Sequence, residues 1–170
     1  PYTVQEICDL FTLLHKLDNG SGIIRQTEFF LYSQKDKEAV ERCRELGYDF
    51  PQITSWIRAK KEDFAIVKEM GLKETGILVS CSDYHIFKKM KWTRSEALKN
   101  YLEVVDAALC EGIVPRCHFE DITRADFFGF VLPFAEKLME MARDSGIPIK
   151  IRACDTLGLG SSSPGVVLPR

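Results

Sequence analysis

The chain has 170 residues, of which 45% are hydrophobic and 28% are charged, and its formal net charge is −2. This composition is typical of a single globular domain. The small negative charge gives no electrostatic reason to expect binding to nucleic acid or to an acidic membrane surface, and no apolar run is long enough to span a bilayer. We therefore expect a cytoplasmic protein with neither a nucleic-acid nor a membrane partner.

Hydrophobic periodicity predicts helices and strands in alternation along the chain. The first helix begins with Thr3 and Glu6 at capping-box spacing and ends before a glycine-rich break. In chain order, we predict a helix over 3–17, a strand over 23–32, a helix over 35–46, a strand over 51–59, a helix over 61–70, a strand over 75–82, a helix over 93–111, a strand over 114–122, a helix over 125–144 and a strand over 148–156.

This alternation is typical of βαβ units and a parallel sheet. Polar residues gather at the C-terminal ends of the predicted strands, namely Glu28, Arg58, Ser82, Asp83, His85, Glu120, Asp121, Asp155 and Thr156. A TIM barrel collects its active site from many strands at that face, whereas a doubly wound sheet uses one switch point, usually with a glycine-rich first turn. The chain has no such turn, so we predict an α/β fold: a partial TIM (β/α)8 barrel of about five parallel strands with helices.

A complete barrel needs about eight strands, and the tail from Gly158 to Arg170 does not supply the remainder. We therefore interpret residues 1–170 as an incomplete TIM-barrel catalytic domain, a fragment that lacks the first strand and the last strands. Open sheet edges have to be paired or covered. The chain is accordingly expected to form a homo-oligomer, and a single monomeric species in light scattering would argue against this.

The six cysteines contain no C-x-x-C pair. Their spacing argues against a thiolate zinc site and against a secreted disulfide scaffold. We expect reduced and mostly buried thiols.

The densest group of ionisable residues runs from Arg116 to Arg124. Strand alternation places Arg116, His118 and Glu120 on one face. It places Cys117, Phe119 and Asp121 on the other. Such a group is costly to bury unless its members pair with each other or with a ligand. In a functional interpretation, Arg116 binds a carboxylate bidentately and Glu120 either transfers a proton or contacts a metal-bound water. In a structural one, the group is a salt-bridge network on the rim of the barrel.

Three further positions leave both interpretations open. Asp155 and Thr156 precede Gly158, which could let a ligand approach the backbone or form an ordinary turn. Glu28 lies within an apolar strand and needs a cationic partner, either Arg25 or an arginine of the barrel such as Arg116 or Arg58. His85 has no second histidine at metal-ligand spacing, so we expect a hydrogen-bonded structural residue and no metal ligand.

The motif Glu120-Asp121-x-x-Arg124 after a strand, followed by a helix and by a strand ending in Asp155-Thr156-x-Gly158, resembles the DRE-TIM metallolyase superfamily. This superfamily includes 2-isopropylmalate, homocitrate and citramalate synthases and hydroxymethylglutaryl-CoA lyases. The stretches 24–33, 82–87 and 116–126 are most similar to Re-citrate synthases. The resemblance covers nearly the whole chain.

The resemblance implies an acyltransferase that condenses acetyl-CoA with a 2-oxo acid, oxaloacetate giving citrate, by a metal-dependent Claisen condensation. The alternatives are a homocitrate, 2-isopropylmalate or citramalate synthase, or a non-catalytic half-barrel module. Among the residues, it implies that Arg116 binds the oxo-acid carboxylate and that Glu120 is an active-site carboxylate. His118 takes the place of a substrate-contacting serine, Thr156 contacts substrate, and Glu28 is a carboxylate on the second barrel strand.

The resemblance also implies a divalent metal ion, such as magnesium, manganese, cobalt or zinc, in the full-length protein. The superfamily holds this metal with an aspartate on the first barrel strand and a His-x-His motif on the seventh. Neither motif is present, because no histidine follows His118. We therefore expect this chain to bind metal poorly and to be inactive alone.

Overall fold

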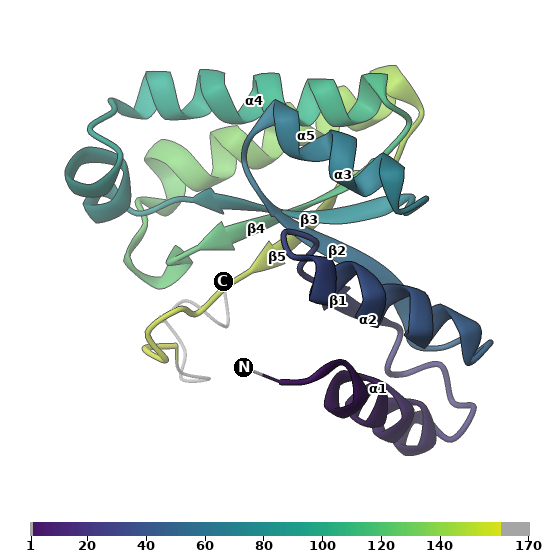
Figure 1. Cartoon of the computed structure of the whole chain (residues 1–170). Helices are drawn as coiled ribbons and strands as arrows, with labels where there is room; N and C mark the ends of the chain where they lie inside the picture. The colour runs from purple at the N-terminus through teal and green to yellow at the C-terminus, as the bar shows by residue number, and fades with distance from the viewer. Residues whose placement is uncertain (1, 161–170) are drawn as a thin grey trace. The chain divides into compact units, whose positions relative to one another are not determined.

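A computed structural model describes residues 2–160 of the chain (Figure 1). The expectation that the tail supplies no further strand falls largely on residues 161–170, which lie outside the described residues. The described strands are hydrogen-bonded in the order β1-β2-β3-β4-β5. They are β1 (Gln26–Phe29), β2 (Gln52–Arg58), β3 (Glu74–Ser80), β4 (Val114–Glu120) and β5 (Lys150–Ala153).

The pairs β1–β2 and β4–β5 are parallel, with helices between successive strands, so the predicted α/β class is confirmed. The chain divides into two compact units, Pro1–Gly76 and Ile77–Arg170. No described helix is long and apolar enough to cross a membrane.

The first unit contains α1 (Val4–Asp18), α2 (Gln34–Glu45) and α3 (Phe64–Glu69). The predicted capping box of Thr3 and Glu6 is present at the start of α1, and an unpredicted one at α2 joins Ser33 to Asp36. Within this unit the hydroxyl groups of Ser55 and Thr75 are 2.8 Å apart, which satisfies two buried polar groups of adjacent strands.

The strand expected over 23–32 is shorter in the structure, because β1 covers only Gln26–Phe29. The buried carboxylate of Asp18 accepts the backbone N–H groups of Gly22 and Ile24 at 2.9 and 2.8 Å. These groups are therefore bound in a loop rather than in a sheet. An aspartate that competes for backbone donors in this way favours turns over strands.

The second unit contains α4 (Arg94–Cys110) and α5 (Leu132–Ser145). Thr93 and Glu96 form the predicted capping box at the start of α4. Phe119 of β4 stacks on Phe134 of α5, with ring centroids 5.0 Å apart and planes at 8°. Since Phe119 faces the helices, the neighbouring positions of β4 face the other side of the sheet.

Two π-helical turns in the second unit, Tyr84–Lys89 and Phe127–Val131, were not predicted. The second turn forms the first part of the single helix expected over 125–144 and leads directly into α5. The side chain of Asp126 caps this turn by accepting the N–H of Gly129 at 2.9 Å. Single π turns occur often at functional sites, and the first one carries His85.

All six cysteines are free, as expected. Cys8, Cys43, Cys81 and Cys117 are buried, whereas Cys110 is exposed. Burial raises the pKa of the Cys117 thiol to about 12, so this sulfur is protonated and unreactive at neutral pH.

Candidate functional site

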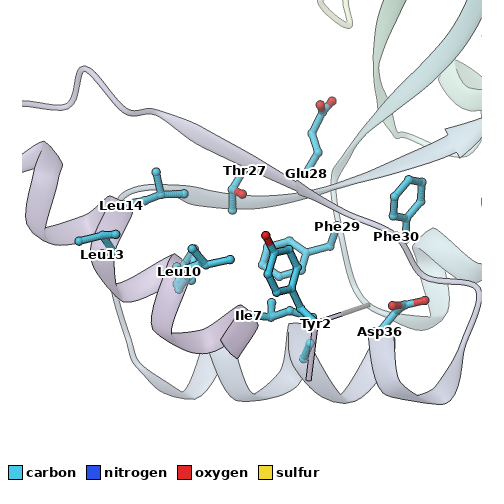
Figure 2. Close-up of a pocket in the computed structure, with 12 residues that line it drawn as sticks. Tyr2, Ile7, Leu10, Leu13, Leu14, Thr27, Glu28, Phe29, Phe30 and Asp36 are labelled. Atoms are coloured by element: carbon cyan, nitrogen blue, oxygen red, sulfur yellow. The ribbon is translucent and has the colours of Figure 1, made fainter. Parts of the chain in front are cut away.

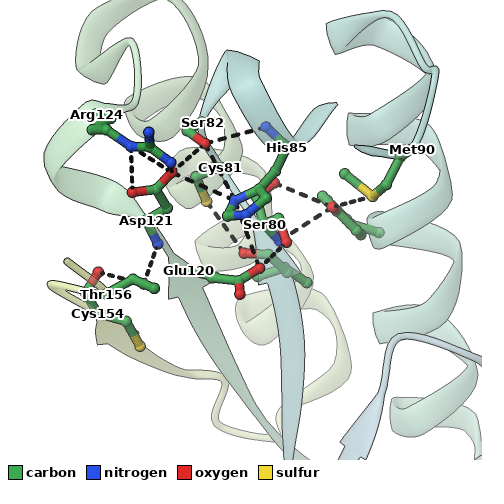
Figure 3. A network of polar contacts seen from close by, with 12 residues as sticks. Ser80, Cys81, Ser82, His85, Met90, Glu120, Asp121, Arg124, Cys154 and Thr156 are labelled. Carbon is green, nitrogen blue, oxygen red and sulfur yellow. Dashed lines mark hydrogen bonds and ion pairs between the residues drawn. The ribbon is translucent and has the colours of Figure 1, made fainter. Parts of the chain in front are cut away.

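Polar side chains from the C-terminal ends of β3, β4 and β5 form one network within the second unit (Figure 3). Backbone hydrogen bonds hold these ends together, since the N–H of Cys81 donates to the carbonyl of Glu120 at 2.9 Å. The N–H of Cys154 likewise donates to the carbonyl of Phe119 at 3.2 Å. The network has two adjacent carboxylates at its centre, Glu120 and Asp121, and they differ in what surrounds them.

Asp121 is fully buried and both of its carboxylate oxygens are engaged. Arg124 donates to it from Nε at 2.9 and 3.0 Å and from Nη2 at 2.5 Å. The hydroxyl of Ser82 donates to Oδ2 at 2.6 Å. The backbone N–H of Asp121 donates to the hydroxyl of Thr156 at 2.8 Å. We call Ser82, Asp121, Arg124 and Thr156 the Asp121 cluster, and it ties three strand ends together.

Hydrogen bonds from Arg124, followed by that from Ser82, lower the pKa of Asp121 below its usual range. Asp121 also has a left-handed backbone conformation, with φ 61° and ψ 38°. Aspartate is among the few residues that tolerate this region. The Asp121 cluster therefore has the features of a structural element rather than of a reacting group.

The carboxylates of Asp121 and Glu120 both approach His85, although alternation was expected to turn them to opposite faces. His85 Nδ1 lies 3.5 Å from Asp121 Oδ2 and 3.8 Å from Glu120 Oε2. β4 ends at Glu120, and Asp121 has turned into the left-handed conformation. The period-two rule does not extend past the end of a strand.

Glu120 accepts a hydrogen bond at Oε2 from the hydroxyl of Ser80, the last residue of β3. Its side chain is 17% exposed, whereas that of Asp121 is 0% exposed. Within the described part of the chain, Glu120 Oε1 makes no hydrogen bond or ion pair. Glu120 is thus the carboxylate of the pair that retains an accessible acceptor oxygen.

His85 lies on the π-helical turn that follows β3. Its Nδ1 is 3.3 Å from the hydroxyl of Ser82, and its backbone N–H donates to the same hydroxyl at 3.4 Å. This agrees with the expected hydrogen-bonded role. The position of its Nδ1 within 3.8 Å of Glu120 and 3.5 Å of Asp121 was not expected.

Arg116 and His118 are both buried, at 4% and 6% exposure, on the face of β4 that carries Glu120. Phe119 stacks on α5, and this is consistent with the predicted alternation, which turns these three residues to the other face. A guanidinium and an imidazole held inside a protein are suited to binding an anionic group.

Thr156 is exposed after β5, and its hydroxyl accepts from the Asp121 backbone. The carboxylate of Asp155 accepts the N–H groups of Leu159 and Gly160 at 2.8 and 2.7 Å. Asp155 therefore supports the ordinary turn interpretation. Thr156 belongs to the network through its hydrogen bond from the Asp121 backbone. This bond does not involve the side chain of another predicted site residue.

Glu28 belongs to the first unit and lines a mainly apolar pocket of about 410 Å³ beside α1 and α2. Figure 2 shows its carboxylate pointing away from Leu10, Ile7 and Phe29, on the other side of β1. In the same unit Arg58 donates to Asp63 at 2.8 and 3.0 Å, so the strand-end arginine has a structural partner.

Ser80 and Tyr101 belong to the network but were not predicted from the sequence. Tyr101 of α4 is 2% exposed, and its hydroxyl donates to the carbonyl of Ser80 and accepts the N–H of Ser80, both at 3.1 Å. The available signal was the repeat of serine at positions 80 and 82, directly at the predicted end of a strand.

The metal ion implied by the resemblance does not fit the residues described. Among residues 2–160, no three or more His, Cys, Asp or Glu side chains are arranged to hold a metal ion. His85 and the two carboxylates are bound to Ser80, Ser82 and Arg124 instead.

A family model described as HMGL-like matches residues 12–165. The chain belongs to the HMGL-like family. A Citrate (Re)-synthase of Clostridium kluyveri is 64% identical over 170 residues, which is 100% of this chain and 38% of that protein. A second Citrate (Re)-synthase, from Syntrophus aciditrophicus, is 61% identical over 170 residues, or 100% of this chain and 27% of that protein.

More distant HMGL-like relatives include 2-isopropylmalate synthase 2 of Caldanaerobacter subterraneus. It is 33% identical over 123 residues, which is 72% of this chain and 30% of that protein. Among solved structures, hydroxymethylglutaryl-CoA lyase from Pseudomonas aeruginosa superimposes with a TM-score of 0.59 at 17% identity, covering 95% of this chain and 54% of that chain. This likeness supports the fold, and the predicted partial TIM barrel is confirmed.

Proposed function

We propose that the chain forms the substrate-side part of an acyltransferase that condenses acetyl-CoA with oxaloacetate to give citrate. The observation that carries the proposal is the identity of 64% and 61% to two Citrate (Re)-synthases over all 170 residues. Since the chain spans only 38% and 27% of these relatives, the activity is proposed for the full-length protein. Residues 1–170 are accordingly proposed to be an incomplete TIM-barrel catalytic domain.

In this proposal Arg116 and His118 bind the carboxylates of the oxo acid. Both side chains are buried on one face of β4, where low dielectric strengthens their attraction for an anion. Glu120 lies one further step along the same face, towards the end of the strand. We assign it to proton transfer, because a carboxylate oxygen without a hydrogen-bond partner among the described residues can accept a proton.

Thr156 and Glu28 are proposed as further substrate contacts. The Thr156 hydroxyl is exposed and retains capacity for a ligand beside its bond from the Asp121 backbone. The Glu28 carboxylate projects from β1 on the side away from α1 (Figure 2). The partners are small molecules, acetyl-CoA and the 2-oxo acid, and the protein is proposed to be a cytoplasmic homo-oligomer. A divalent metal would need ligands other than the residues described.

The proposal is tested by the substrate preference of the full-length protein. It is incubated with acetyl-CoA and, in separate reactions, oxaloacetate, 2-oxoglutarate, pyruvate or 2-oxoisovalerate, and release of free CoA thiol is followed. We expect the highest kcat/KM with oxaloacetate. Activity that is highest with 2-oxoisovalerate would assign a 2-isopropylmalate synthase, the second candidate, which is favoured by the 33% identity to such an enzyme. Thiol release with none of the acids would contradict an acyltransferase of this kind.

A further inference from the structure

The ends of β3 and β4 carry two matched pairs of residues. Ser80 donates a hydrogen bond to Glu120, and Ser82 donates one to Asp121 (Figure 3). Two serines separated by one residue thus bind two consecutive carboxylates. We propose that Ser80 is a positioning residue that fixes the carboxylate of Glu120 for proton transfer. This inference rests on the proposed function and adds a residue that the resemblance does not assign.

Ser80 is itself held firmly. Its backbone N–H and carbonyl are both bound by the hydroxyl of Tyr101, which lies within the helix-covered core. Tyr101 packs on Phe134 at a centroid distance of 5.8 Å and on Trp92 at 6.1 Å. The next residue, Cys81, donates its N–H to the carbonyl of Glu120. The backbone of Ser80 is therefore held at a fixed position relative to Glu120, the residue that its hydroxyl binds.

The two serine–carboxylate pairs differ in whether a carboxylate oxygen remains without a hydrogen bond. Ser82 and Arg124 together use both oxygens of Asp121, which is fully buried. Ser80 uses only Oε2 of Glu120, the oxygen that also faces His85 at 3.8 Å. Oε1 is therefore the oxygen that can meet a reacting group. A glutamate side chain has several rotatable bonds, so placing its carboxylate for proton transfer costs conformational entropy. A hydrogen bond that already holds one oxygen removes most of this cost.

The inference predicts how substitutions combine. In the full-length protein, Ser80→Cys keeps the size of the side chain but offers only a weak donor, and Ser80→Ala removes the donor. Both are expected to lower kcat by roughly tenfold or more, because misplacement of a catalytic group is costly, while KM for the oxo acid changes little. Ser80→Thr retains the hydroxyl and is expected to keep most of the activity. In a Glu120→Gln background, Ser80→Ala is expected to have no additional effect, because Ser80 acts through Glu120.

Ser82→Ala is the matched control, since it removes an equivalent hydroxyl two residues along the same strand end. It acts on the Asp121 cluster, so its effect on kcat is expected to add to that of Glu120→Gln. Wild-type kcat in Ser80→Ala and Ser80→Cys, together with an inactive Glu120→Gln protein, would overturn the inference and leave the proposed function intact. Full activity of Glu120→Gln would instead remove Glu120 from the proposed function. An additive effect of Ser80→Ala on Glu120→Gln would show a merely structural role for Ser80.

Discussion

The substitution Asp121→Asn tests whether the Asp121 cluster is structural. Asparagine keeps the size of the side chain and tolerates the left-handed backbone of this position. It removes the charge that accepts three contacts from Arg124 and one from Ser82. Any loss of stability therefore comes from the side-chain interactions and not from backbone strain.

The magnitude follows from the exposure of the partners. Arg124 is 36% exposed, so solvent screens its ion pair, which contributes about 0–1 kcal/mol. Ser82 is 0% exposed, and a buried hydroxyl that loses a charged acceptor costs about 1–3 kcal/mol. We expect the free energy of unfolding at pH 7 to fall by about 2 kcal/mol. Asp106→Asn, at an exposed position of α4 in the same unit, is the matched control.

The same pair of proteins gives a pH dependence with a defined sign. The pKa of Asp121 is lowered in the folded protein, chiefly by Arg124, whereas an unfolded aspartate titrates near about 3.9. The stabilisation is thus complete above pH about 4 and is lost as the pH falls through the folded pKa. Urea unfolding followed by Trp92 fluorescence, in a Trp56→Phe background, measures both effects. A difference below about 0.5 kcal/mol at pH 7, or one that does not shrink under acid conditions, would refute the structural role.

Three further predictions concern core packing, helix capping and thiol burial. Phe134→Ala is expected to lose about 3–5 kcal/mol of unfolding free energy, because Phe134 is fully buried against Phe119, while Met139→Ala on the exposed face of α5 changes little. Thr93→Ala removes the capping box of α4 and is expected to cost about 1 kcal/mol in thermal unfolding, with Thr93→Ser retaining most of it. In a native thiol titration Cys110 is expected to react first and Cys117 slowly, because Cys110 is exposed, whereas Cys117 is buried and burial raises the pKa of its thiol to about 12. Cys110→Ser is expected to abolish the fast phase, and equal rates for all thiols would contradict the described core.

Features set by local sequence were predictable. The capping box at Thr93 and the apolar periodicity after it located α4 to within a residue at each end. Alternation separated Phe119 from Arg116, His118 and Glu120, and Phe119 does stack on a helix, Phe134 of α5. In each case the deciding interactions lie within a few residues of each other, so the pattern contains them.

Features set by distant contacts were not predictable. Ser80 and Glu120 are 40 residues apart, and nothing near either residue in the sequence indicates that they meet. His85 likewise reaches Asp121 only through the folding of β3 beside β4. The π-helical turn that precedes α5 is capped by the side chain of Asp126, which a helical pattern of apolar residues does not reveal.

The most direct test of the proposed function compares the full-length protein with its Glu120→Gln variant in the release of CoA thiol from acetyl-CoA with oxaloacetate. Glu120 is the carboxylate of the network with an accessible oxygen, so the unmodified protein is expected to release thiol and the variant to do so at least about 100-fold more slowly. Both proteins should unfold at the same urea concentration. Equal rates for the two proteins would contradict the assignment of proton transfer to this site.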